Sequence, residues 1–267
     1  LLIIAILTDQ QWFCVFSYAY RFNLRSRFGI SKKHCKIIAR TAHFSSLKIP
    51  VKQPWGRFMA KDFSHPKIVE AYDAHIRNLI PAYELVHLTI QSILTTYLQR
   101  EAKILIAGCG TGYELQYLAA QFPNAHFVAI DPSSEMIKKA KSRIQSSDLS
   151  ARVEFIHGDT TVLEAYPDYF DAALAILVSH FIVEPHKTEF FKQIHHSLVK
   201  DGILITYDLM HMDAKTQQIL FQLTQFNGLS EKQSLNMVER LENDFSLIDS
   251  SAMYSLLDNS GFIMTKI

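Results

Sequence analysis

A glycine-rich stretch, Lys103–Gly112, constrains the fold of this chain more than any other part of its sequence. Four apolar, strand-forming residues lead into glycines at positions 108, 110 and 112, and a helical apolar pattern follows over Tyr113–Gln121. Because glycine has no Cβ, the backbone amides of such a loop can approach a ligand closely, and a helix N-terminus attracts its negative end. The stretch predicts a strand, a ligand-binding loop and a helix, although an ordinary strand–helix turn can carry the same glycines.

Two acidic residues follow at the ends of the next two predicted strands. Asp131 ends the run His126–Ile130, nineteen residues after Gly112, and Asp159 follows the run Arg152–His157. An acid about 20 residues beyond the glycine loop of a βαβ unit can accept both hydroxyls of a ribose. The structural alternative is a helix cap or a turn, since Asp131 precedes Pro-Ser-Ser. Two acids at successive strand ends favour a nucleotide site.

The remaining apolar runs continue an alternation of strands and helices. Tyr169–Val178 and Ile203–Asp208 are typical of a fourth and a fifth strand, joined by a helix that starts at Pro185. Helical patterns also cover Ile68–Ile80 and Tyr83–Arg100 before the glycine loop, and 213–226, 230–243 and 250–260 after the fifth strand. This order predicts an α/β fold with a doubly wound, mostly parallel Rossmann-like sheet and helices on both faces.

Three motifs in order resemble those of class I S-adenosyl-L-methionine (SAM)-dependent methyltransferases: Gly108-Cys-Gly-Thr-Gly112, Ile130–Met136 and Gly158-Asp159-Thr160. The resemblance covers roughly residues 62–267. It implies that the glycine loop cradles the amino-acid end of SAM, that Asp131 binds the ribose and that Asp159 meets the adenine amine. A dinucleotide dehydrogenase is the rival, but its loop is usually G-x-G-x-x-G, whereas the spacing here is G-x-G-x-G. Ile106 departs from the family, since many members have an acid there.

Further stretches resemble one branch of that family, the carboxy-SAM synthases linked to tRNA wobble-uridine modification. They are Ile80–Tyr83, Phe181–Pro185, Leu198–Gly202 and Asn227–Ser230. The resemblance implies a cofactor pocket lined by Tyr83, Gly108, Cys109, Gly110, Asp131, Pro132, Asp159 and Thr160. We expect Gly112 and Ile176 to belong to the cofactor site as well.

Two positions differ from that branch. Gln225 stands where the branch has an arginine for the extra carboxylate, and Ile176 replaces an asparagine at the end of the fourth strand. An amide cannot form the bidentate charged pair that a carboxylate prefers. Plain methyl transfer is therefore favoured over carboxy-SAM chemistry.

His180 and Asp208 are the candidate catalytic residues. His180 follows the fourth strand and Asp208 ends the fifth, at the edge where open α/β sheets bind ligands. Either side chain could orient an acceptor or take a proton from it. The structural alternatives are a histidine that bonds loop backbone and an aspartate that caps the next helix. Because transfer from an activated sulfonium chiefly needs alignment, an obligatory base is not required.

Charge divides the chain into two parts. Residues 1–61 hold eleven Lys/Arg and one acid, so residues 62–267 hold the remaining 16 basic and 25 acidic residues, a net charge of −9. This balance disfavours broad binding to nucleic acid and favours a small-molecule acceptor. An RNA-modification enzyme and a non-catalytic SAM-binding protein are the alternative functions. Cys14, Cys35 and Cys109 lack metal or disulfide spacing, so we expect no metal and a reducing, cytoplasmic setting.

We predict three segments: a basic leader (1–46) outside the functional domain, an N-terminal helical cap (47–100) and the SAM-binding core (101–267). The leader opens on the apolar run Leu1–Leu7, which Asp9 breaks before the roughly 20 residues of a membrane span. We expect the leader to be poorly packed and without stable membrane association; a transit peptide and a membrane anchor are the alternatives. Only six residues follow Gly261, so we expect a core that is cut short, with an unpaired sheet edge.

Overall fold

The computed structural model describes residues 2–6, 63, 65–145 and 148–264. These residues contain a seven-stranded sheet in the order β4-β3-β2-β5-β6-β1-β7, in which the paired strands are parallel. The strands are β1 (Leu2–Ile6), β2 (Lys103–Ala107), β3 (His126–Asp131), β4 (Val153–His157), β5 (Phe170–Ile176), β6 (Leu198–Tyr207) and β7 (Ile263–Met264).

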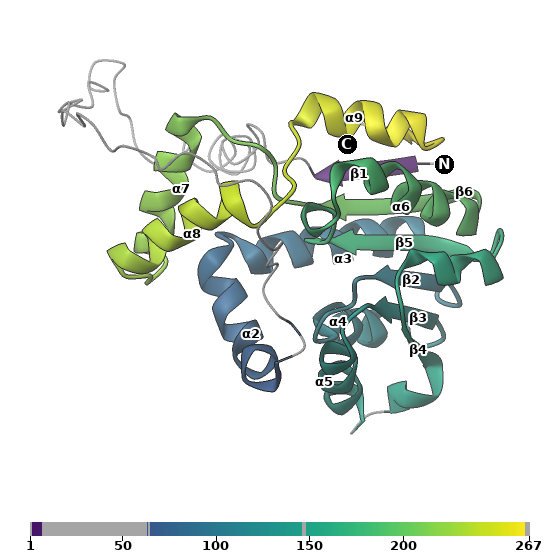
Figure 1. The fold of residues 1–267 in the computed structure, drawn as a ribbon. Helices are drawn as coiled ribbons and strands as arrows, with labels where there is room; N and C mark the ends of the chain where they lie inside the picture. Colours follow the sequence, from purple (N-terminus) through teal and green to yellow (C-terminus); the bar gives the residue numbers. More distant parts are fainter. Residues whose placement is uncertain (1, 7–62, 64, 146–147, 265–267) are drawn as a thin grey trace, which may run out of the picture. The chain divides into compact units, whose positions relative to one another are not determined.

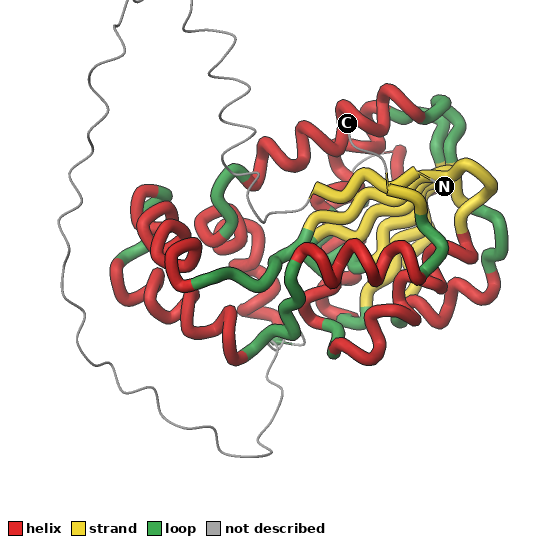
Figure 2. The backbone as a smooth tube through the Cα atoms, turned by 90° about the horizontal axis from the view of Figure 1, so that it is seen from above, coloured by secondary structure: helices red, strands yellow, loops and turns green. Residues whose placement is uncertain are grey.

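Alternate residues of the central strands fill two cores, one on each face of the sheet. On β2, Ile104 and Ile106 join one core while Leu105 and Ala107 join the other, all at 2% exposure or less. The first core is covered by α3 (Tyr83–Tyr97), α4 (Tyr113–Gln121) and α5 (Ser134–Ile144), the second by α6 (Glu184–Ser197) and α9 (Ser250–Asn259). Helices flank the sheet on both sides (Figure 2), so the predicted doubly wound Rossmann-like fold is confirmed.

Three further helices lie beyond the carboxyl ends of the central strands: α2 (Pro66–Leu79), α7 (Ala214–Phe226) and α8 (Glu231–Asn243) (Figure 1). Helices α7 and α8 pack against each other, and α2 packs against α5. The Asn227 side chain donates to the carbonyls of Arg77 (2.8 Å) and Asn78 (3.1 Å), which ties the end of α7 to α2. None of the helices in the described part of the chain is long and apolar enough to cross a membrane.

The start of the chain differs from the prediction of a poorly packed leader. Residues Leu2–Ile6 form β1, which pairs with β6 on one side and β7 on the other. An uninterrupted apolar run suits a parallel strand, because such strands are covered on both faces. Strand β6 therefore lies inside the sheet, and the expected shortened core with an unpaired edge stays a prediction. The rest of the leader lies outside the described residues, and the predicted domain boundaries stay predictions.

Candidate functional site

Packing requires glycine at the start of the loop that joins β2 to α4. Gly108 has a φ of +75°, and a Cβ built there would lie 2.5 Å from Cγ2 of Val178. At Gly112 a Cβ would lie 2.9 Å from the Cβ of Ala140. A Cβ at Gly110 would meet nothing within 4 Å. The two outer glycines thus permit close packing of neighbouring elements, whereas open space remains over Gly110.

The loop amides bond largely within the protein. The N–H groups of Gly108 and Cys109 both donate to the Ile130 carbonyl at 2.9 Å, and Gly110 N–H donates to Oδ2 of Asp131 at 2.8 Å. The Gly112 amide donates to the Cys109 carbonyl at 2.8 Å. These contacts fix the loop to the end of β3. A ligand over Gly110 would therefore lie beside the Asp131 carboxylate.

Asp131 ends β3 and combines the two roles considered from the sequence. Its Oδ1 accepts from the N–H of Ser133 at 2.8 Å, and Ser133 is the N-cap of α5. The carboxyl group is buried, which raises its pKa, while the bonds from Ser133 and Gly110 oppose that rise. Each carboxylate oxygen has a further acceptor site. Asp131 can therefore hold the loop and still accept hydroxyl groups of a ligand.

The end of β4 lies beside Asp131, since the N–H of Gly158, which follows β4, donates to the Asp131 carbonyl at 3.1 Å. The exposed Asp159 side chain caps the short helix Thr160–Ala165, accepting from Thr161 N–H at 3.0 Å. The hydrogen bond from the Thr161 hydroxyl is the largest of the effects that lower the Asp159 pKa. The capping alternative thus holds for Asp159, and its carboxylate stays accessible.

The other predicted pocket residues have structural partners of their own. The Pro132 carbonyl accepts from Nε2 of His157 at 3.0 Å, and the buried Thr160 hydroxyl donates to Oε1 of Gln193 at 2.5 Å. Cys109 is buried, and burial raises the pKa of its thiol well above the ordinary value. Ile176 ends β5 opposite Tyr207 of β6. These residues belong to the carboxyl edge of the sheet or to the loops that follow it.

A row of aromatic rings connects the surroundings of Asp131 to the end of β5. The Phe63 carbonyl accepts from the Ser133 hydroxyl at 2.7 Å. The Phe63 ring makes edge contacts with Tyr72 at 5.8 Å and with Phe181 at 5.5 Å between centroids. The Phe181 ring lies 4.1 Å from the His180 ring, measured the same way. The predicted cofactor acid and the predicted catalytic histidine therefore border the same aromatic row.

The structure brings the two predicted catalytic residues together as a buried pair. Nδ1 of His180 is hydrogen-bonded to Oδ1 of Asp208, and the residues are 4% and 2% exposed. Asp208 also accepts three backbone N–H groups: Ser179 at 2.5 Å, His180 at 3.2 Å and Leu209 at 2.8 Å. The sequence placed each residue at a strand end but did not predict that they would touch.

The hydrogen bonds determine the protonation of this pair. Burial alone raises the Asp208 pKa, but the charge of His180 and the hydrogen bonds from His180, Ser179 and Leu209 outweigh burial and bring it below its ordinary value. An ionised carboxylate has only acceptor sites, so Nδ1 of His180 must carry the hydrogen of the shared bond. In the neutral imidazole Nε2 is then an acceptor. The pair can take up a proton at Nε2.

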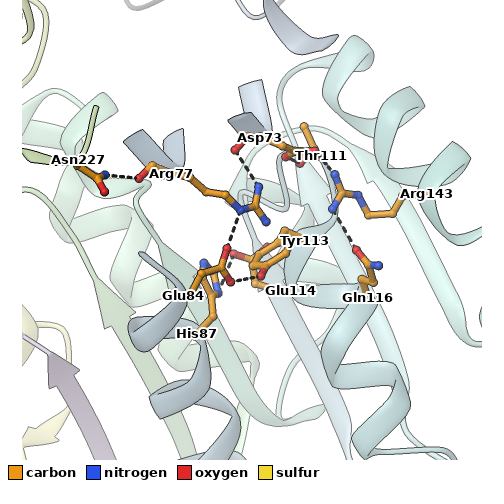
Figure 3. A network of polar contacts seen from close by, with 10 residues as sticks. All are labelled: Asp73, Arg77, Glu84, His87, Thr111, Tyr113, Glu114, Gln116, Arg143 and Asn227. Carbon is orange, nitrogen blue, oxygen red and sulfur yellow. Dashed lines mark hydrogen bonds and ion pairs between the residues drawn. The ribbon is translucent and has the colours of Figure 1, made fainter. Parts of the chain in front are cut away.

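A second polar network links α2 to the glycine loop (Figure 3). The Asp73 carboxylate forms an ion pair with Arg143 of α5 and accepts from the Thr111 hydroxyl at 2.6 Å. Arg77 donates to Oε1 of Glu84 at 2.6 Å and to the Asp73 carbonyl at 2.8 Å. Asp73 and Arg143 were not singled out from the sequence, because their pairing across 70 residues leaves no local signal.

Tyr83 belongs to an aromatic cluster beneath this network, with centroid distances of 4.4 Å to His87 and 5.6 Å to Tyr113. Glu114 lies there too, 3.9 Å from Nδ1 of His87. Burial raises the Glu114 pKa to about 7 and lowers the His87 pKa to about 4. Within the described residues, Nε2 of His87 is buried without a hydrogen-bond partner. Both groups are therefore in their neutral forms between about pH 4 and about pH 7.

We predict that Glu114→Gln reduces the loss of folding stability that the parent chain undergoes as the pH rises. The folded-state pKa is raised from 4.5 to about 7, so the folded chain binds this proton more tightly and loses stability as the pH passes from 4.5 to 7. Between pH 5 and pH 8 the variant is expected to gain about 2 kcal/mol in unfolding free energy relative to the parent. Urea denaturation at both pH values measures this gain. Glu101→Gln, at an exposed position bonded to Asn124, is the control and should show no such gain.

Comparison with known proteins agrees with the geometry. Residues 104–202 match the methyltransferase domain family. The carboxy-S-adenosyl-L-methionine synthase of Nautilia profundicola is 29% identical over 202 residues, covering 73% of this chain and 84% of the synthase. The malonyl-[acyl-carrier protein] O-methyltransferase of Priestia megaterium is 31% identical over 142 residues, covering 53% of this chain and 47% of that enzyme.

A solved structure shares the fold. It is phosphoethanolamine N-methyltransferase 2 of Haemonchus contortus in complex with SAM, with a TM-score of 0.54 and 19% sequence identity. The alignment covers 76% of this chain and 43% of that protein. At this identity the likeness supports the arrangement of sheet and helices and says nothing of the acceptor.

Proposed function

Because the chain belongs to the class I SAM-dependent methyltransferases, we propose that it methylates a small-molecule acceptor at the His180–Asp208 pair. SAM supplies a methyl group already activated on a sulfonium. The observation that carries the proposal is the buried hydrogen bond between His180 and Asp208 at the carboxyl edge of the sheet.

The chain's residues fit this cofactor. Open space over Gly110 lies beside the Asp131 carboxylate, which retains acceptor sites for the ribose hydroxyls. Asp159 would meet the adenine, next to Asp131 through the Gly158 contact. The rest of the proposed pocket comprises Tyr83, Gly108, Cys109, Gly112, Pro132, Thr160 and Ile176.

In the transfer itself the protein aligns an acceptor and manages one proton. With Nδ1–H directed at Asp208, the neutral His180 ring presents an acceptor at Nε2. A hydroxyl or amine bonded there would be oriented. Its proton would pass to Nε2 as the nucleophile bonds to the methyl carbon and the carbon–sulfur bond breaks, with the electron pair left on sulfur as a neutral thioether. Asp208 holds the tautomer and stabilises the charged ring.

A small-molecule acceptor is supported by the net charge of −9 over residues 62–267. The similarity to the carboxy-SAM synthase of Nautilia profundicola makes carboxy-SAM chemistry the second candidate function. It is disfavoured by the half-buried Gln225, an amide at the position where an arginine would pair with the extra carboxylate. RNA modification and cofactor binding without transfer each give a distinct result in an acceptor assay. The cytoplasmic setting and the boundaries at residues 46 and 100 are further parts of this proposal.

The test is calorimetric titration of the whole chain with SAM, carboxy-SAM and NAD. We expect SAM to bind, carboxy-SAM to bind more weakly and NAD not to bind. Tighter binding of carboxy-SAM would favour the synthase alternative, and preference for NAD would contradict the proposal.

Incubation with methyl-labelled SAM and panels of small alcohols, acids and amines would then identify the acceptor. Transfer to tRNA alone would exclude a small-molecule acceptor. A chain that binds SAM and transfers its methyl group to none of these compounds or to tRNA would favour a non-catalytic SAM-binding protein.

A further inference from the structure

A lysine lies fully buried beside the proposed catalytic pair. Lys187, in the first turn of α6, is 0% exposed, and its Nζ donates to the carbonyl of Ser179. Lysine is almost never fully buried unless it is paired, because removing an ammonium group from water is costly. The surroundings of Lys187 must therefore compensate its charge.

That compensation runs through one peptide group. The carbonyl of the peptide between Ser179 and His180 accepts from Lys187, while the N–H of the same peptide donates to Oδ2 of Asp208 at 3.2 Å. The peptide dipole thus has a cation at its oxygen and an anion at its hydrogen, the favourable orientation. The next peptide is held as well, since Ser246 N–H donates to the His180 carbonyl at 2.9 Å. The backbone that carries His180 is fixed on both sides.

Several charged groups in the described part of the chain lie around the pair. Burial lowers the Lys187 pKa below its ordinary value, and the negative charges of Asp208 and Glu184 offset only part of that effect. His180 is an ionisable partner of Asp208. The Phe181 and Phe245 rings lie 4.1 and 4.8 Å from the His180 ring between centroids, and Asp244, next to Phe245, is paired with Arg240 at 2.5 Å. Lys187 is thus a cation that offsets the charge of Asp208 when the His180 ring is neutral.

We propose that Lys187 is a positioning residue for methyl transfer, which holds the Ser179–His180 peptide and balances Asp208 so that His180 stays neutral. Loss of a nearby positive charge would favour the imidazolium form of His180. That form has no acceptor at Nε2, so the ring could not take a proton from the acceptor. The inference rests on the proposed function of the His180–Asp208 pair.

The test is NMR titration of His180 in the whole chain carrying Lys187→Met, which keeps the length of the side chain and removes its charge. The titration midpoint of the ring is expected to rise by about one pH unit, since a nearby positive charge has been removed. Lys187→Arg should restore the parent midpoint. Lys192→Met, at an exposed position of the same helix, should leave the midpoint unchanged. A folded Lys187→Met variant with the parent midpoint would overturn the proposal.

A second measurement covers the case in which Lys187→Met does not fold. The 13Cε resonance of Lys187 in the parent chain reports its charge, and we expect the ammonium form at neutral pH. A neutral amine would overturn the proposal without any variant. The titration with SAM tests the proposed function separately, because a parent chain that binds no SAM contradicts it. The His180 midpoint and the Lys187 resonance test the role of Lys187 whether or not the cofactor binds.

Discussion

Asp208→Asn is expected to slow methyl transfer by about 100- to 10,000-fold, the range for loss of a positioned general base. An asparagine amide has one acceptor oxygen and a donating NH2 group, but four hydrogen bonds point at the Asp208 carboxylate. If its oxygen faces the Ser179 and His180 amides, its NH2 group faces Nδ1 of His180. The ring must then accept at Nδ1 and carry its hydrogen on Nε2. The tautomer reverses, and the proton acceptor is lost.

The matched control for this substitution is Asp213→Asn, the same chemical change at the exposed N-cap of α7. The single-turnover rate with methyl-labelled SAM compares the two variants, and 15N shifts of His180 report its tautomer without an acceptor. Equal rates in the two variants would remove the pair from the mechanism. A reversed tautomer with an unchanged rate would show that transfer needs alignment alone.

Local signals explain what the sequence predicted well. The glycine loop, the strand before it and helix α4 were expected at the positions where they occur, because glycine spacing and apolar periodicity act over a few residues. Both Asp131 and His180 were placed at the correct sheet edge by the rule that ligands bind at the carboxyl ends of parallel strands. The fold class followed from the same alternation of strands and helices.

Long-range pairing explains what the sequence could not predict. The hydrogen bond between His180 and Asp208 joins two strand ends 28 residues apart, and the contact of Asp73 with Arg143 joins two helices. Lys187 was missed because a lysine in the first turn of a helix is ordinarily exposed, and its burial and its bond to the Ser179 carbonyl depend on the tertiary fold. Strand β1 was missed because an apolar run does not specify which strand it pairs with, and its partner β6 lies far away in the sequence.

The second large effect is expected at the cofactor acid. Asp131→Asn should weaken SAM binding by about 3 kcal/mol, or about 150-fold, since hydrogen bonds to a charged group are worth about 1.5–3 kcal/mol each. Part of this loss would come from the loop, because Gly110 and Ser133 both donate to the carboxylate. Asp159→Asn, at an exposed cap, should cost much less. Calorimetry of both variants gives the two affinities.

A ligand analogue separates the two contributions at Asp131. If the carboxylate accepts the ribose hydroxyls, the parent chain should discriminate against 2′-deoxy-SAM, and Asp131→Asn should lose most of that discrimination. If the carboxylate only anchors the glycine loop, both ligands should weaken equally and the discrimination should persist. The comparison uses the difference in binding free energy between SAM and 2′-deoxy-SAM, measured in the parent and in Asp131→Asn. General damage to the loop weakens both ligands equally, so it does not change this difference. If Asp131→Asn still discriminates between the two ligands, the role of Asp131 is structural: it connects Gly110 to Ser133, the N-cap of α5.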